Sequence, residues 1–356
     1  MNNPSAKRKH ASQPRHLLGI EGMTAAEITN ILSAARVMKY KTAFTGMDIK
    51  SEEWIAPKFR THASLNPKLK GFGNPLKQKT GGMWSAREAE KGIPLKDVTV
   101  ATLFFENSTR TRSSFELAAR MLGANVISFV SGSSSMAKGE SVYDTARTIE
   151  AMGVNIAVVR HSCAGVPRQL TSVINASIIN AGDGAHEHPT QALLDGFTIH
   201  ERLGGIKGLR VCIVGDIANS RVARSNIFLL KTMGATVVVC GPRTLMPRDM
   251  EKALGVEVDC DMPTAIAKSD VVIMLRIQSE RQAAGKVPTL GEYRNLYGIG
   301  GRLPENVRLV LHPGPVNRGV EMSSEAMDSQ RSAVTQQVSN GVFIRMAALA
   351  LLGVKK

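Results

Sequence analysis

From residue 98 onward, short apolar runs alternate with amphipathic helical patterns. The runs are rich in β-branched residues and have the length of buried strands. They cover residues 98–105, 125–130, 155–160, 177–181, 210–215, 235–240, 271–275 and 308–311. Helical patterns lie between most of them, for example at 142–152, 190–202 and 221–233. This alternation predicts an α/β fold with two doubly wound parallel sheets, each covered by helices.

Two further helical segments flank this alternation, and one of the helices within it has a special position. Thr24 is an N-cap candidate with Glu27 three residues on, the spacing of a capping box, before a helix over residues 25 to about 40. The helix at 190–202 ends at two glycines and is expected to bridge the two units. The last helix, about 334–352, follows the final strand and could pack on either unit.

Two segments lack any periodic pattern. Residues 1–15 are polar and basic and are interpreted as a disordered arm. Residues 41–92 are rich in Lys, Gly and Pro and contain both tryptophans, Trp54 and Trp84. A stretch of this length without structure is uncommon inside a compact domain, so it is interpreted as a basic insertion of unknown role that is partly ordered.

Composition narrows the class of protein. With 356 residues, 43% apolar and 21% charged, the chain suits two soluble domains. No apolar run approaches the roughly 18 residues of a membrane span, and the N-terminus lacks a secretory h-region, so a cytoplasmic protein is expected. The four cysteines have no C-x-x-C spacing. A net charge of +15 calls for anionic partners, which charge alone leaves open as nucleic acid, membrane surface or small acidic substrates.

In parallel α/β folds, ligands bind beyond the carboxyl ends of the strands. The first strand is followed by Ser108-Thr109-Arg110-Thr111-Arg112, a turn that fits either a phosphate site or a helix cap with surface arginines. Later strand ends also carry cations, histidines, hydroxyls or amides, namely Lys138, Arg160, His161, His186, His188, Arg221, Arg276, Gln278 and His312. Together they predict a cleft between the two domains that binds more than one anion.

Other kinds of site fit less well. G-x-G-x-x-G, G-x-x-x-x-G-K-[ST] and G-x-S-x-G are all missing from the sequence, which argues against NAD, ATP and serine hydrolase chemistry. His186 and His188 could be two metal ligands, but no matching carboxylate or cysteine set is evident, so no metal is expected. The sequence contains no motif typical of a nucleic-acid-binding protein, although the basic arm and insertion could bind polyanions.

The turn at 108–112, together with His188-Pro189-Thr190-Gln191, resembles the aspartate/ornithine carbamoyltransferase family. Features that resemble its aspartate branch are Phe104-Phe105-Glu106, Lys138-Gly139-Glu140, the segment 276–281 and His312-Pro313-Gly314-Pro315. The Ser-Met-Gly loop and the His-Cys-Leu-Pro segment expected of the ornithine branch are missing from the sequence. The resemblance covers residues 16–40 and 93–356.

The resemblance implies transfer of the carbamoyl group of carbamoyl phosphate to L-aspartate, an early step of pyrimidine synthesis, without a cofactor. It implies a carbamoyl-phosphate domain at 16–187 plus 331–356, an inter-domain helix at 188–203 and an aspartate domain at 204–330. It also implies a homotrimer with shared active sites. Whether the trimer docks to a regulatory chain or to dihydroorotase stays open.

The resemblance also assigns roles to the strand ends. The phosphate would be held by Ser108, Thr109, Arg110 and Thr111. The oxyanion would be stabilised by Thr111, Arg160 and His188. Gln191 would contact the carbamoyl amide, and the Pro313-Gly314 backbone would lie against the carbamoyl amine. Arg112 is expected to brace the turn against Glu106 or Glu116.

For the acceptor, the resemblance implies that Arg221 binds the α-carboxylate and Arg276 the β-carboxylate, helped by Gln278. Lys138 would also act on aspartate, and Ser134 and Lys138 would reach in from the neighbouring subunit. Guanidinium forks match carboxylates and would repel a cationic acceptor such as ornithine. The departing phosphate would take the amine proton, so no protein base is needed and catalysis rests on positioning and electrostatics.

Overall fold

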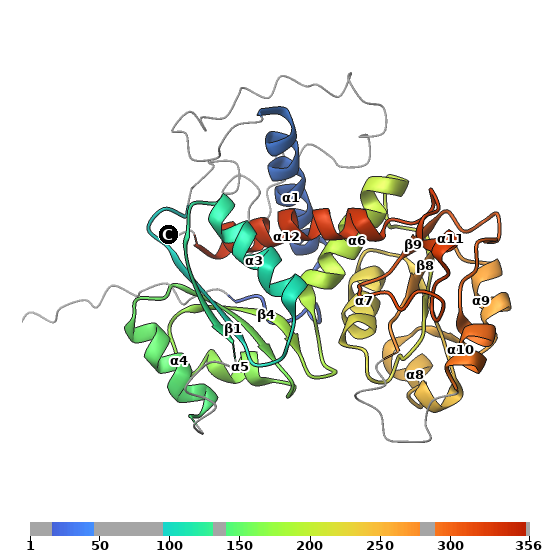
Figure 1. Ribbon diagram of the computed structural model, residues 1–356, viewed down its shortest axis with the longest axis horizontal. Coiled ribbons are helices and arrows are strands. Elements are labelled where there is room, and N and C mark those ends of the chain that lie inside the picture. Colours follow the sequence, from blue (N-terminus) through green and yellow to red (C-terminus); the bar gives the residue numbers. More distant parts are fainter. Residues whose placement is uncertain (1–15, 46–94, 131–139, 278–288, 354–356) are drawn as a thin grey trace, which may run out of the picture.

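The computed structural model describes residues 16–45, 95–130, 140–277 and 289–353. The predicted arm and the insertion from residue 46 onward lie outside these residues. Within the described part of the chain, no helix is both long and apolar enough to cross a membrane. Figure 1 shows two α/β units side by side, with helix α6 between them and helix α12 running from the edge of the second unit across the first.

The first sheet has the order β2-β1-β3-β4, and all its strands are parallel. Its strands are β1 (Thr99–Phe104), β2 (Asn125–Val130), β3 (Ile156–His161) and β4 (Ser177–Asp183). The helices that follow them are α3 (Thr109–Met121), α4 (Val142–Ala151), α5 (Val166–Leu170) and α6 (Pro189–Leu203). The four apolar runs predicted for this unit are therefore strands, with ends shifted by at most two residues.

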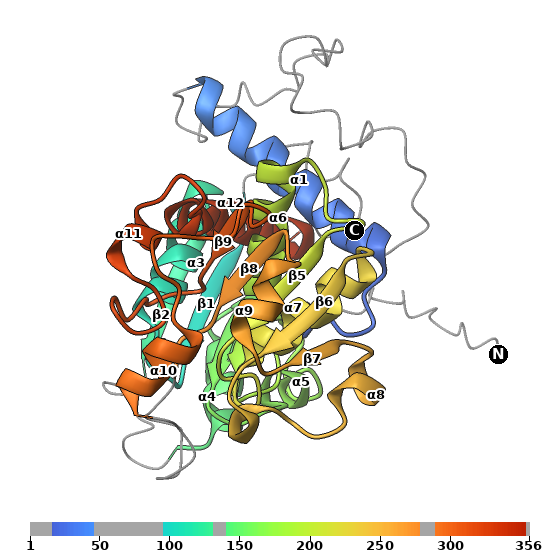
Figure 2. The same ribbon diagram turned by 90° about the vertical axis from the view of Figure 1, so that its right-hand side faces the viewer.

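The second sheet has the order β7-β6-β5-β8-β9 and is also parallel throughout. Its strands are β5 (Arg210–Val214), β6 (Thr236–Cys240), β7 (Glu257–Asp259), β8 (Val271–Met274) and β9 (Leu309–Leu311). Its helices are α7 (Arg221–Thr232), α8 (Met250–Leu254), α9 (Met262–Ala267), α10 (Leu290–Tyr297) and α11 (Ser324–Met327), with a 3₁₀ turn at Arg243–Leu245. Figure 2 shows this sheet in front, with α9 and α10 on one side of it. The predicted fold class, two doubly wound parallel sheets, is confirmed.

Strand alternation divides the core into layers. Along β1, Val100 and Phe104 belong to a cluster with residues of α1 (Ala25–Thr45), α3 and α12 (Val334–Gly353), whereas Ala101 and Leu103 pack with α4 and α5. Along β5, the odd positions join the cluster that contains α6 and α7, and the even positions pack with α9, α10 and α11. Both faces of each sheet are covered, which explains the continuous apolar runs in the sequence.

Helices α1 and α12 can be compared with the helices predicted at residues 25 to about 40 and 334–352. The capping box before α1 is confirmed, since Glu27 N–H donates to Thr24 Oγ1 (3.2 Å) and Thr24 N–H donates to Glu27 Oε2 (2.9 Å). α1 continues to Thr45, five residues beyond its expected end. Helix α12 packs against α1, α3 and α6, on the face of the first sheet that α4 and α5 leave open.

The strand order reverses once in each sheet, which marks two expected ligand-binding positions. In the first sheet the chain moves outward from β1 to β2 and then returns to β3, so the order reverses between β1 and β3. In the second sheet the reversal lies between β5 and β8. Loops diverge at such a reversal and leave room for a ligand beyond the carboxyl ends of the strands. The segments at these points carry Arg110, Arg160, Arg221 and Arg276.

Candidate active site

The turn between β1 and α3 presents the first group of candidate side chains. Ser108 is the N-cap of α3, and its hydroxyl makes no capping hydrogen bond, so it remains available to a ligand. Thr111 is buried, whereas Thr109 and Arg110 are exposed. Arg112 lies 3.6 Å from Glu116 one helical turn on, so of its two expected partners the structure selects Glu116. Free N–H groups and the positive end of the α3 dipole favour an anion at this turn.

Arg110 lies where the two units meet. Although Arg110 as a whole is exposed, partial desolvation of its guanidinium and the nearby positive charge of Arg276, on the segment after β8, lower the pKa of that group. A Cβ placed on Gly314 would lie 3.3 Å from Arg110 Cζ, and Gly314 has φ +71°, so glycine lets the backbone approach this side chain. The structure therefore brings together Arg110, Arg276 and the Pro313-Gly314 segment.

Arg160 and Arg221 share one carboxylate. Glu106 accepts two hydrogen bonds from Arg221, at 3.0 and 2.6 Å, and one from Arg160 at 3.2 Å. Gly182 (φ +115°) lies against both arginines, since a Cβ there would be 3.1 Å from Arg221 Nε and 3.2 Å from Arg160 Nη1. Arg160 also donates to the Ala181 carbonyl at 3.1 Å. Glu106 was one of two expected partners of Arg112, and its bridge between Arg160 and Arg221 was not predicted from the sequence.

His188 is the N-cap of α6 and is 4% exposed. Burial and the nearby charges of Arg160, Arg221 and Arg345 hold its pKa well below the ordinary value, so the imidazole is neutral at physiological pH. Among the described residues, its Nδ1 has no hydrogen-bond partner. A neutral imidazole beside several guanidinium groups suits hydrogen bonding to a polarised carbonyl better than proton abstraction.

Arg345, on α12, is a buried cation that sequence reasoning missed. Its Nη1 donates to Ser114 Oγ at 2.8 Å, and its guanidinium lies over the Phe115 ring, 5.2 Å from the centroid. Burial lowers its pKa to about 10, which leaves it charged at neutral pH. An arginine inside an otherwise apolar last helix was the signal in the sequence.

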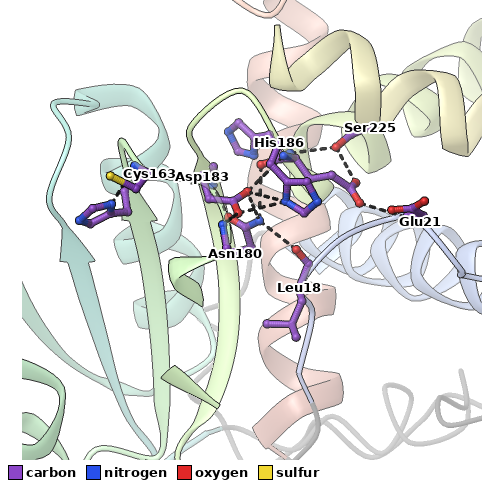
Figure 3. A network of polar contacts seen from close by, with 12 residues as sticks. Leu18, Glu21, Cys163, Asn180, Asp183, His186 and Ser225 are labelled. Atoms are coloured by element: carbon purple, nitrogen blue, oxygen red, sulfur yellow. Dashed lines mark hydrogen bonds and ion pairs between the residues drawn. The ribbon is translucent and has the colours of Figure 1, made fainter. Parts of the chain in front are cut away.

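A second carboxylate cluster surrounds His186 (Figure 3). The His186 ring Nδ1 lies 3.1 Å from Asp183 Oδ2. Glu187 Oε2 accepts hydrogen bonds from Ile20 N–H and Ser225 Oγ, both at 2.7 Å, and its Oε1 accepts one from Glu21 N–H at 3.1 Å. Ser225 Oγ in turn accepts the His188 N–H at 2.8 Å. Glu187 therefore ties the N-terminal segment to α7 and supports His188.

The structure places two carboxylates beside His186, so this group could in principle hold a metal ion. Ligand atoms of Glu21, His186 and Glu187 lie within 4.8 Å of one another, a carboxylate set that was not evident in the sequence. His188 is not part of this group. Because Glu187 already accepts three hydrogen bonds from its surroundings, we interpret the group as structural, holding the segment before α1 against α7.

Gln191 lies in the first turn of α6 and is buried. Its Nε2 donates to Asp195 Oδ1 at 2.9 Å. Asp195 was also missed, although a carboxylate four residues after Gln191 in an apolar helix was visible in the sequence. Three expected site residues, Ser134, Lys138 and Gln278, lie outside the described residues.

Family models match most of the chain. The carbamoyl-P binding domain of the aspartate/ornithine carbamoyltransferases matches residues 75–201, and the Asp/Orn binding domain of the same family matches residues 207–352. The aspartate carbamoyltransferase catalytic subunit of Halothermothrix orenii is 54% identical over 269 residues, covering 75% of this chain and 86% of that protein. The corresponding subunit of Carboxydothermus hydrogenoformans is 54% identical over 270 residues, with 75% and 86% covered.

Solved structures of aspartate transcarbamoylases match the fold of this chain. Aspartate transcarbamoylase from Trypanosoma cruzi in complex with carbamoyl phosphate and aspartate superimposes with a TM-score of 0.76 at 27% identity, covering 97% of this chain and 98% of that chain. The catalytic subunit of M. jannaschii aspartate transcarbamoylase gives a TM-score of 0.73 at 29% identity, with 95% and 97% covered. The chain belongs to the aspartate/ornithine carbamoyltransferase family, which confirms the resemblance seen in its motifs.

Proposed function

We propose that this protein is an aspartate carbamoyltransferase, which transfers the carbamoyl group of carbamoyl phosphate to the amine of L-aspartate. The products are N-carbamoyl-L-aspartate and phosphate, and the reaction belongs to de novo pyrimidine biosynthesis. The observation that carries the proposal is the pairing of arginines from the two units, Arg110 with Arg276, and Arg160 with Arg221 beside a neutral His188. Relatives more than 50% identical carry this name.

In the proposed reaction, the turn at Ser108–Thr111 and the α3 N-terminus bind the phosphate of carbamoyl phosphate. The aspartate amine attacks the carbonyl carbon, and the resulting oxyanion is stabilised by Thr111, Arg160 and neutral His188. The bond between the carbonyl carbon and the phosphate oxygen then breaks, and the departing phosphate takes the amine proton. Gln191 and the Pro313-Gly314 backbone accept hydrogen bonds from the carbamoyl amine.

Aspartate binds through its two carboxylates. Arg221 binds the α-carboxylate and Arg276 the β-carboxylate, with help from Gln278 and Lys138. Arg221 is 6% exposed and already binds the Glu106 carboxylate through two hydrogen bonds, so its guanidinium is held in a geometry that suits a carboxylate ligand. Several guanidinium groups at this site disfavour ornithine, whose side chain is cationic.

The decisive assay offers carbamoyl phosphate with aspartate and with ornithine in parallel. We expect turnover with aspartate and at least about a hundredfold lower kcat/KM with ornithine, because guanidinium groups face the acceptor. Arg276→Ala should raise the KM for aspartate, whereas Arg318→Ala, which removes an exposed arginine paired with Asp328, serves as the matched control. Turnover of ornithine but not aspartate would contradict the proposal.

The same proposal assigns a role to each domain. Residues 16–187 with 331–356 bind carbamoyl phosphate, 188–203 form the inter-domain helix and 204–330 bind aspartate. The packing of α12 on α1 and α3 supports placing the last helix with the first unit. The protein is expected in the cytoplasm.

We further propose a homotrimer in which Ser134 and Lys138 of one subunit complete the site of its neighbour. The exposure of Thr109 and Arg110 within one subunit supports such sharing. Lys138→Ala and Arg110→Ala should each abolish activity, and mixed subunits should recover part of it because one intact site can assemble. No recovery after verified subunit exchange would refute shared sites. Native mass would also distinguish a bare trimer from an assembly with a regulatory chain or dihydroorotase.

A further inference from the structure

Asp195 lies at the centre of a buried polar network that the proposed mechanism does not use. Its side chain is fully buried on α6. Three amide groups donate to it: Gln191 Nε2 and Gln337 Nε2 to Oδ1, at 2.9 and 2.6 Å, and Asn226 Nδ2 to Oδ2 at 2.8 Å. These donors come from α6, α12 and α7, so one carboxylate joins helices from distant parts of the sequence.

The first connection fixes the direction of the Gln191 amide. Because Nε2 donates to Asp195, the amide oxygen of Gln191 must point the other way. Among the described residues, none donates a hydrogen bond to that oxygen. The carboxylate therefore selects the orientation in which Gln191 offers an acceptor rather than a donor to its remaining surroundings.

The second connection reaches the segment after β9. Gln337 donates to Asp195 and accepts the backbone N–H of His312 through Oε1 at 2.9 Å. His312 Nδ1 accepts the N–H of Gly314 at 2.8 Å. The same oxygen of Asp195 thus anchors the turn that carries the Pro313-Gly314 backbone to Arg110.

Both connections end at groups proposed to accept hydrogen bonds from the carbamoyl –NH₂. That amine is what distinguishes carbamoyl phosphate from acetyl phosphate, which has a methyl group of similar size in its place. A site built to bond an N–H rejects the analogue that lacks it, because its own polar groups are then left unpaired. Such rejection requires acceptors that are held in place before the substrate arrives.

We propose that Asp195 is a positioning residue that makes the site selective for carbamoyl phosphate over acetyl phosphate, by orienting Gln191 directly and the His312–Gly314 turn through Gln337. The inference rests on the proposed function. It predicts that the acceptor oxygen of Asp195, rather than its charge, is the essential feature. Asp195→Asn can keep Oδ1 for both glutamines. Its new amide can donate to Asn226 Oδ1, which has no partner among the described residues, once the Asn226 amide turns over and gives up its hydrogen bond to the Val222 carbonyl.

The test measures phosphate release from carbamoyl phosphate and from acetyl phosphate at saturating aspartate. Where acetyl transfer is too slow, the inhibition constant of acetyl phosphate against carbamoyl phosphate replaces it. Asp195→Ala should lower the selectivity ratio about tenfold or more, mainly through a loss with carbamoyl phosphate. Asp195→Asn should stay within about threefold of the wild-type ratio.

Two further variants separate positioning from simple damage to the fold. Gln337→Met leaves Asp195 in place but releases the His312 turn, so it should also lower the ratio, and it decides the question if Asp195→Ala does not fold. Asn226→Ala removes a donor from the same carboxylate on the side away from both acceptors. It is the matched control and should leave the ratio unchanged even if stability falls.

An unchanged ratio in Asp195→Ala, or in Gln337→Met where Asp195→Ala does not fold, would overturn the inference, as would an equal fall in Asn226→Ala. These outcomes differ from failure of the proposed function. If the proposed function is wrong, the wild-type protein itself will release no phosphate from carbamoyl phosphate in the presence of aspartate.

Discussion

Asp195 should make the stability of this protein depend on pH in a way that one substitution removes. Burial raises the pKa of its carboxyl from 3.8 to about 6, despite the three amide donors that favour the ionised form. A change of this size corresponds to a cost of about 3 kcal/mol for keeping the carboxylate ionised inside the folded protein. Asp195→Asn removes the ionisable group but keeps an oxygen acceptor.

The direction follows from proton binding. Between about pH 6 and pH 4 the folded protein holds a proton on Asp195 that the unfolded chain has released, so lowering the pH stabilises the folded state through this group. The Asn variant lacks this contribution. The unfolding free energy of wild type minus that of Asp195→Asn should therefore rise by about 1.4 kcal/mol from pH 8 to pH 5, and the total rise should approach about 3 kcal/mol near pH 3.

Urea unfolding followed by circular dichroism, at a fixed protein concentration and at several pH values, measures this difference. Other titrating groups are common to both proteins and cancel in the comparison. Asp97→Asn removes an exposed carboxyl and controls for the change in net charge. A difference that stays constant from pH 8 to pH 5, or that falls, would refute a raised pKa at Asp195.

Three other substitutions test the meeting of the two units. Glu106→Gln should weaken the bridge between Arg160 and Arg221 and lower kcat/KM for aspartate about tenfold or more, measured by steady-state kinetics. Gly182→Ala places a methyl group against both arginines at φ +115° and should cost about 1–3 kcal/mol in urea unfolding, together with a higher KM for aspartate. Arg221→Lys loses the bidentate geometry and should raise that KM at least about tenfold while leaving the calorimetric affinity for carbamoyl phosphate unchanged; an equal loss of both would contradict its role.

The positions of the strands were predictable because both faces of each sheet are buried. Val271–Met274, for example, is a short continuous apolar run that is buried at every position and matches the observed strand closely. The missed strand, Glu257–Asp259, is a three-residue edge strand that is acidic at both ends and only half buried. Such a segment owes its conformation to pairing with β6, and nothing local in the sequence indicates that pairing.

The site was predictable only in part. Strand ends indicated Arg110, Arg160, Arg221 and Arg276 because the carboxyl ends of parallel strands meet at one edge. The partners of Glu106 lie 54 and 115 positions away in the chain, and Asp195 is bound by Gln337 across 142 positions. Contacts at such separations depend on how α6, α7 and α12 pack, and one sequence carries no signal for them.

The position of α12 has a consequence for biosynthesis. The sheet face that includes Val100, Ile156 and Val158 packs in one cluster with α1, α3 and α12, and Gln337 and Arg345 enter the site from the same helix. Because α12 is translated after both sheets, both α/β units emerge from the ribosome nearly complete before this helix is available to cover the first sheet. The nascent chain must therefore keep an apolar sheet face partly uncovered until α12 has emerged from the ribosome, and the active site cannot form before that point.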